Sequence, residues 1–177
     1  MKNPVTFWSG ILLSSLLCAP ASFAQETPKL SDAEVASVAV VANQIDIEYA
    51  DIAREKSKDA EILKFAETMA NDHNAVIAQA AALVKKLGVT PKDNDVSKKL
   101  LADAETTKTA LRKQSGRAFN KAYIDNEVAY HKAVISAVDG LLIPETENAE
   151  LKALLQNVLP ALKTHLAHAE MVQKNFK

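Results

Sequence analysis

The feature that most restricts the fold is an unbroken helical repeat of mainly apolar residues between positions 62 and 87. Its members recur at alternating spacings of four and three residues: Ile62, Ala66, Met69, His73, Val76, Ala80, Leu83 and Leu87. This spacing places all of them on one face of a helix, whereas a strand would put alternate residues on one face. Gly88 and Pro91 follow, and both are typical of a helix end. The sequence therefore predicts a long helix, from about residue 57 to residue 87, packed against other helices.

Four further segments have a similar helical spacing of apolar residues. They are residues 32–56, 95–114, 117–138 and 146–174. The segment 95–114 is the most polar of the five predicted helices, and the other four are long and of comparable length. The sequence therefore predicts an all-α fold, a ferritin-like four-helix bundle in which 95–114 is an additional crossover helix. With this crossover, the second and fourth helices run parallel.

Capping and helix-breaking residues set the predicted boundaries of these helices. Ser31 followed by Glu34 forms a capping box at the start of the first helix. Gly140 and Pro144 are expected to close the fourth helix. Pro160 lies inside the last helix, where a proline is expected to produce a kink. The total of 177 residues suits a single domain, predicted here as residues 32–177.

The first 24 residues have the pattern of a signal peptide. Lys2 precedes an apolar run from Val5 to Leu17, and Ser22 and Ala24 place small residues at the two positions typical of a cleavage site. The run is shorter than the ~20 apolar residues of a membrane span. We therefore expect a signal peptide over 1–24, a polar tail over 25–31, a periplasmic location and no stable membrane span after cleavage.

Composition excludes several other classes of protein. Cys18 is the only cysteine, and it follows Leu17 rather than the small residue that precedes a lipidated cysteine. Cleavage after Ala24 would remove it, and with it any disulfide, thiolate metal site or covalent haem. The net charge of −1 and the lack of a basic block argue against nucleic-acid binding. The sequence points to no particular protein partner and leaves an oligomer open.

Several polar residues interrupt the predicted apolar faces near mid-helix. Three of the four histidines lie on such faces of three different helices: His73, His131 and His165. Glu127 lies one turn before the second of these on the same face. On the first helix, Asp46 and Glu48 flank the apolar stripe equally, so the spacing does not choose between them. Groups from four helices could therefore meet at the middle of the bundle.

This set of residues has two main interpretations. Imidazole and carboxylate groups that converge inside a bundle are typical of a metal site, and they suit zinc, iron, copper or manganese. The candidate ligands are His73, His131, His165, Asp46 and Glu127. Alternatively, the same residues form a hydrogen-bonded core network in a non-catalytic structural or interaction module.

The sequence does not establish that the protein is an enzyme. No glutamate lies three residues before any histidine, which disfavours a di-iron ferroxidase centre. A serine–histidine–acid set, a glycine-rich phosphate loop and a helical HExxH motif are also absent from the sequence. An oxidoreductase that uses the same histidine site is a third interpretation.

Three blocks of sequence resemble the DUF4142 family. They are Phe65-x-x-x-Met69-x-x-Asp72-His73, then Gly116-x-x-Phe119-x-x-x-Tyr123 followed by His131, then Leu159-Pro160-x-Leu162-x-x-His165-Leu166-x-x-Ala169. The resemblance covers roughly residues 32–172. It implies an exported bacterial protein with a ferritin-like helical fold and no settled biochemical function.

The resemblance also bears on the candidate residues. The recurrent histidines of the family map onto His73, His131 and His165, without implying that they bind metal. The acidic residue that the family carries in its first helix maps onto Asp46, which favours it over Glu48. The aspartate that usually follows the family's phenylalanine is replaced by Asn120, so no carboxylate is expected there.

The signal-peptide pattern predicts the N-terminus of the mature protein. We expect cleavage after Ala24, so that the exported protein begins at Gln25 in the periplasm. Mass spectrometry of the periplasmic protein checks this expectation. An intact Met1, or a lipid on Cys18, would contradict it.

Overall fold

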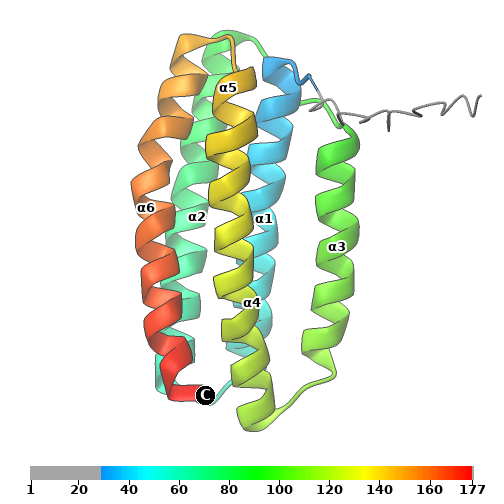
Figure 1. The fold of residues 1–177 in the computed structure, drawn as a ribbon. Helices are drawn as coiled ribbons and strands as arrows, with labels where there is room; N and C mark the ends of the chain where they lie inside the picture. The colour runs from blue at the N-terminus through cyan, green and yellow to red at the C-terminus, as the bar shows by residue number, and fades with distance from the viewer. Residues whose placement is uncertain (1–28, 177) are drawn as a thin grey trace, which may run out of the picture.

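The structure is a computed structural model that describes residues 29–176 (Figure 1). Its main helices are α1 (Asp32–Lys56), α2 (Ala60–Leu87), α3 (Asp95–Arg112), α4 (Gly116–Ala137) and α6 (Ala149–Gln173). Shorter helical turns complete it: a π-helical turn (Val138–Leu142), α5 (Ile143–Glu145) and a 3₁₀ turn (Lys174–Phe176). No strand occurs between residues 29 and 176, which confirms the predicted all-α class. The predicted signal peptide, its cleavage site and Cys18 lie outside the described residues.

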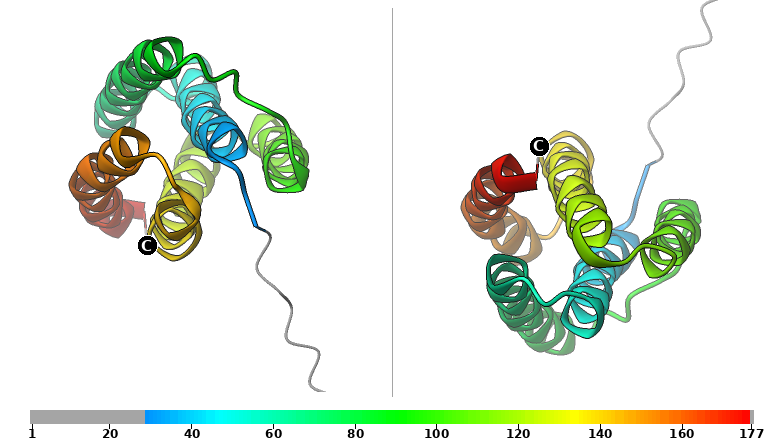
Figure 2. Two further views of the ribbon diagram at one scale, coloured as in Figure 1. Left: turned by 90° about the horizontal axis from the view of Figure 1, so that it is seen from above. Right: turned by 90° about the horizontal axis from the view of Figure 1, so that it is seen from below.

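The topology is that of a four-helix bundle with one crossover. Helices α1, α2, α4 and α6 surround the core, and α3 lies outside them against α1 (Figure 2). In the view of Figure 1, α1 and α3 run downward, whereas α2 and α4 both run upward. Helices α2 and α4 are therefore parallel, and α3 is the connection between them, as predicted for a ferritin-like bundle.

The ends of α1 and α2 agree closely with the predicted boundaries. The Glu34 carboxylate accepts hydrogen bonds from the backbone N–H and the hydroxyl of Ser31, at 3.0 and 2.8 Å, at the start of α1. Asp59 caps α2 by accepting from two backbone N–H groups. Gly88 ends α2 in the left-handed conformation, with φ 64°. Local sequence thus fixes where each of these helices begins or ends.

The α-helical part of the fourth helix ends at Ala137, within one residue of the prediction, but Gly140 does not end the helical path as expected. The π-helical turn and α5 continue this path to Glu145. Val138 and Leu142 in this turn are buried in the core, and their packing outweighs the low helix propensity of Gly140. Pro144 lies in the first turn of α5, where a proline needs no hydrogen-bonded N–H.

The last helix begins slightly later than predicted and continues through its proline. Asn148 caps α6 with its side-chain oxygen, so the helix starts at Ala149 rather than at Thr146. The Thr146 hydroxyl instead donates to the Leu142 carbonyl oxygen at 2.6 Å. Pro160 is an exposed residue inside a helix that runs from Ala149 to Gln173.

The core of the bundle has two chemically different halves. The lower half lies where α1 ends and α2 and α4 begin (Figure 1). It contains aromatic side chains, including Tyr49, Phe65, Phe119 and Tyr123. The upper half is aliphatic, with valine, leucine and alanine side chains. Buried polar residues lie between the two halves.

None of the helices between residues 29 and 176 combines the length and the hydrophobicity that a membrane span requires.

The backbone at Gly88 predicts a specific cost of substitution. An added methyl group would meet no atom within 4 Å, so Gly88→Ala should destabilise the protein only through the left-handed backbone, by about 1–2 kcal/mol. Gly140 has equal space around it without a positive φ, so Gly140→Ala is the matched control and should be neutral or stabilising. Urea denaturation of both variants measures the difference. Equal destabilisation by the two substitutions would contradict this account.

Candidate metal centre

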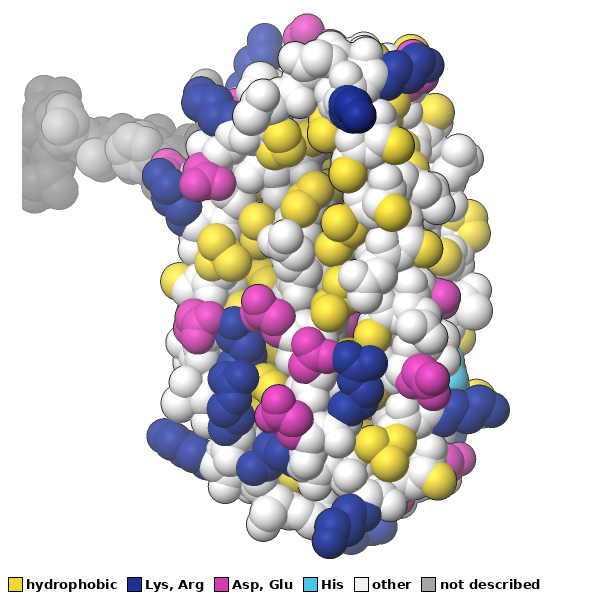
Figure 3. Space-filling view, turned by 180° about the vertical axis from the view of Figure 1, so that it is seen from behind, with side chains coloured by type: hydrophobic (Ala, Val, Ile, Leu, Met, Phe, Trp, Pro, Cys, Tyr) yellow, Lys and Arg dark blue, Asp and Glu magenta, His cyan; other side chains and the backbone are white. Residues whose placement is uncertain are grey.

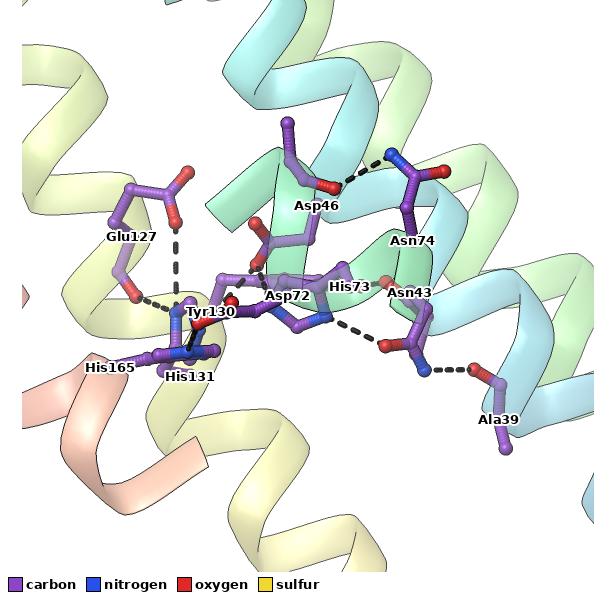
Figure 4. Close-up of polar contacts among 12 residues, drawn as sticks. Ala39, Asn43, Asp46, Asp72, His73, Asn74, Glu127, Tyr130, His131 and His165 are labelled. Atoms are coloured by element: carbon purple, nitrogen blue, oxygen red, sulfur yellow. Dashed lines mark hydrogen bonds and ion pairs between the residues drawn. The ribbon is translucent and has the colours of Figure 1, made fainter. Parts of the chain in front are cut away.

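Three histidine side chains from three helices converge at the middle of the bundle (Figure 4). His73 comes from α2, His131 from α4 and His165 from α6, with exposed fractions of 4%, 1% and 6%. Their ring centroids form a nearly equilateral triangle, with sides of 5.3, 5.6 and 5.8 Å. Each ring offers a nitrogen atom within 4.8 Å of those of the other two. The structure thus brings together the three histidines that the helical spacing selected.

A hydrogen-bonded asparagine determines the tautomer of His73. The Asn43 side-chain amide donates to the Ala39 carbonyl oxygen at 2.8 Å, so its own oxygen faces the imidazole. That oxygen lies 2.7 Å from His73 Nδ1 and accepts its N–H. The proton therefore resides on Nδ1, and Nε2 carries a lone pair.

The other two histidines are held in the same manner. His131 Nδ1 donates to the Glu127 backbone carbonyl oxygen at 3.0 Å. His165 Nε2 donates to the Asp72 carboxylate at 2.9 Å. The remaining nitrogens, His73 Nε2, His131 Nε2 and His165 Nδ1, are buried and have no hydrogen-bond partner in the described part of the chain. Each imidazole thus has one nitrogen fixed by an acceptor and one with a free lone pair.

Two carboxyl groups lie beside the imidazoles. The Asp46 Oδ2 atom is 3.5 Å from His73 Nε2 and 3.6 Å from His131 Nε2, too far for good hydrogen bonds. Glu127 Oε2 is 3.6 Å from His131 Nδ1. Both carboxyl groups are buried, and neither forms a hydrogen bond with any described residue. Glu48, the other acidic candidate on α1, is instead exposed and pairs with Lys108.

Burial shifts the pKa of two of the imidazoles and of both carboxyl groups in the absence of a cation. It raises the pKa of Asp46 to about 8. Burial and the nearby Asp46 also raise the pKa of Glu127 well above its ordinary value. Burial, with the neighbouring imidazoles, lowers the pKa of His73 to about 3. Burial likewise lowers the pKa of His131 to about 4. At neutral pH His73 and His131 are therefore neutral imidazoles with available lone pairs, and the two carboxyl groups are mostly protonated.

Two residues that orient the imidazoles were not among the sequence candidates. Asn43 lies one turn before Asp46 on the same face of α1, and this spacing is the only sequence signal that could have identified it. Asp72 belongs to the sequence block that ends in His73, yet its carboxylate holds His165 of another helix. Asn120, where the family usually has an aspartate, is buried away from the cluster and accepts a hydrogen bond from Ser57.

The fold and this cluster define the chain as an all-α bundle with buried histidine, aspartate and glutamate groups that could hold a metal ion. Residues 18–172 match the model of the DUF4142 family, which is described as a domain of unknown function. The chain therefore belongs to the DUF4142 family, as the three sequence blocks indicated. No curated protein and no solved structure shows a significant match to it.

The raised pKa of Asp46 predicts how the metal-free protein responds to pH. The pKa of Asp46 is 3.8 in the unfolded chain and about 8 in the folded protein. Between these pH values the unfolded chain has lost the proton and the folded protein still holds it, so the folded state becomes less stable as the pH rises. Asp46→Asn removes this cost, so in the presence of a chelator the variant should be more stable at pH 8. We expect a difference on the order of 1–3 kcal/mol that shrinks towards zero near pH 4.

Chemical denaturation across this pH range measures the effect of Asp46→Asn. Glu55→Gln is the matched control, since Glu55 is an exposed carboxylate on the same helix. A stability difference for Asp46→Asn that does not change between pH 4 and pH 8 would contradict the assignment.

Proposed function

We propose that this protein binds one transition-metal ion through His73, His131 and His165, with the Asp46 carboxylate as a fourth ligand. The observation that carries the proposal is the convergence of three buried imidazoles, each of which has one nitrogen without a partner among the described residues. Neutral imidazoles with one nitrogen held by a fixed acceptor are the form in which histidine binds metals.

The geometry fits a mononuclear site. Two ligands at ~2.0–2.1 Å from a tetrahedral ion are about 3.4 Å apart, so nitrogens that now lie within 4.8 Å need to approach by at most roughly 1.5 Å. The Asp46 carboxylate lies on the same side of His73 and His131 as their free nitrogens (Figure 4). Three imidazoles and one carboxylate suit zinc, iron, copper or manganese.

The electrostatics of the cluster also favour a cation. Buried carboxyl groups without hydrogen bonds cost stability, and they ionise when a metal ion supplies the compensating charge. Asp46 would then lose its proton and bind, and Glu127 would remain beside His131 as an outer carboxyl group. Metal uptake should therefore release protons and become weaker as the pH falls.

The alternative, a core network in a structural module, requires different contacts. Such a network stabilises a bundle when its members are hydrogen-bonded to one another. In this cluster, the contacts of Asp46 with the two imidazoles are 3.5 and 3.6 Å, and the imidazoles bond to outer residues instead. These distances support the metal-binding proposal over the network.

We place this metal binding in the cell envelope, because residues 1–24 have the pattern of a signal peptide. A role in holding or buffering a metal ion there, for example under stress, needs only binding of the ion and no catalytic residue.

Substitution of single histidines tests the proposal. Protein purified without chelator or polyhistidine tag should contain about one equivalent of metal by elemental analysis. Added metal at 1,000 times its Kd should stabilise the folded state by about 4 kcal/mol. His73→Ala, His131→Ala and His165→Ala should each abolish this stabilisation.

The fourth histidine of the chain provides the matched control. His168 packs on the Phe65 ring and is outside the cluster, so His168→Ala should retain the metal-dependent stabilisation. A parent protein that gains no stability from any of the four metals, but is destabilised by His73→Ala, would support the core network instead.

A further inference from the structure

A cavity of about 520 Å³ adjoins the histidine cluster and occupies the upper half of the bundle. Its walls come mainly from α1, α2, α4 and α6, with smaller parts from α3 and the π-helical turn, and they include His73, His131 and His165. The volume lies within the range of about 300–1,000 Å³ that is typical of small-molecule sites. The cavity is thus large enough for an organic ligand in contact with the proposed metal.

Small side chains create this space. Alanines contribute to the wall from each of the four helices, among them Ala39, Ala80, Ala137 and Ala161. The lower half of the same bundle is filled by aromatic rings such as Phe65 and Tyr123. A void costs stability, so alanines facing one another across a bundle are unfavourable unless something fills the space.

The polar groups of the cavity are concentrated at one end. Except for Gln79 and Asp103, its polar lining residues belong to the histidine level: Asn43, Asp46, Asp72, His73, Tyr130, His131 and His165. The rest of the wall consists of alanine, valine, leucine and isoleucine, with no lysine or arginine. A matching ligand has a long apolar body and one polar head.

The cavity is elongated along the helix axes. On α1 its lining residues extend from Ala36 to Asp46, which corresponds to ~15 Å at 1.5 Å per residue.

The cavity is reached from solvent between exposed lining residues. They include Ala75 and Gln79 on α2 and Ala161 on α6. Seen from behind, charged side chains lie at the top end and in the lower half of the molecule, and apolar and uncharged atoms predominate between them (Figure 3). An apolar chain can therefore reach the cavity without passing a charged rim at that level.

From these features we infer that the cavity binds a single-chain carboxylic acid, with its alkyl chain among the alanines and its carboxylate on the metal held by the three histidines. The position of the head group rests on the proposed metal binding. Metal sites of this kind can expand from four to five ligands, which leaves room for one more oxygen donor. A carboxylate is preferred over a cationic head group because the metal supplies positive charge.

Calorimetry with dodecanoate tests the inference. Protein loaded with zinc should bind dodecanoate, below its micellar concentration, at least tenfold more tightly than the same protein in chelator. Dodecanol has the same chain without the carboxylate, and zinc should not improve its binding. Zinc-loaded protein that gives no binding of dodecanoate, or that binds dodecanol equally well, would overturn the inference.

A matched pair of substitutions locates the alkyl chain. Ala80→Phe fills the cavity and should weaken dodecanoate binding at least tenfold without changing the zinc content. Ala82→Phe adds the same side chain at an exposed position of α2 that does not line the cavity, and it should have no effect. Ala137→Leu is a smaller obstruction for use if circular dichroism shows that Ala80→Phe does not fold. Unchanged affinity in a folded cavity variant would overturn the inference.

The experiment separates this inference from the metal proposal. Zinc uptake without dodecanoate binding rejects only the ligand and leaves the metal site intact. A parent protein that takes up no metal rejects the proposed function. Dodecanoate binding that is the same with and without zinc rejects the metal-held head group.

Discussion

The burial of five titratable side chains between four helices is the constraint on which the rest of this structure depends. The three imidazoles and two carboxyl groups have been removed from water, and their free nitrogen and oxygen atoms have no partner in the described chain. Such a cluster persists only because the surrounding core contributes enough apolar burial to offset it. The aromatic half of the core, with Phe65, Phe119 and Tyr123 fully buried, provides much of this burial.

The cluster is also preorganised by groups other than its five side chains. Asn43, Asp72 and the Glu127 backbone carbonyl oxygen each accept one imidazole N–H, which leaves the other nitrogen of each ring without a partner. Three independent hydrogen bonds therefore hold the three rings in place. Because each acceptor comes from a regular helix, the orientation is fixed by the backbone of the bundle rather than by a loop.

The two halves of the core differ in their side chains and in their proposed roles. The lower half is closely packed, whereas the alanine-lined upper half leaves a cavity next to the histidines. A protein selected for stability alone would fill that space and replace buried carboxyl groups with apolar ones. The cavity in the upper half and the buried carboxyl groups of the cluster both lower the free energy of unfolding. This cost is consistent with a site for an ion and a ligand.

The sequence by itself determined the helices, their caps and the topology. Capping signals at Ser31 and Gly88 act within one turn, and the apolar spacing of residues 62–87 depends only on the helical period. It also placed His73, His131, His165 and Glu127 on interior faces, because that requires no knowledge of the neighbouring helix. Asp46 and Glu48 could not be separated by spacing alone, although the family resemblance favoured Asp46.

Only the tertiary structure decided the contacts between helices. Asn43 bonds to His73, and Asp72 of α2 bonds to His165 of α6. Both contacts depend on the rotation and height of each helix in the bundle. The same is true of the continuation past Gly140, where burial of Val138 and Leu142 overrides a local helix-ending signal. The cavity arises from alanines on four different helices. Side chains far apart in sequence meet only after packing, so no local pattern records their contacts.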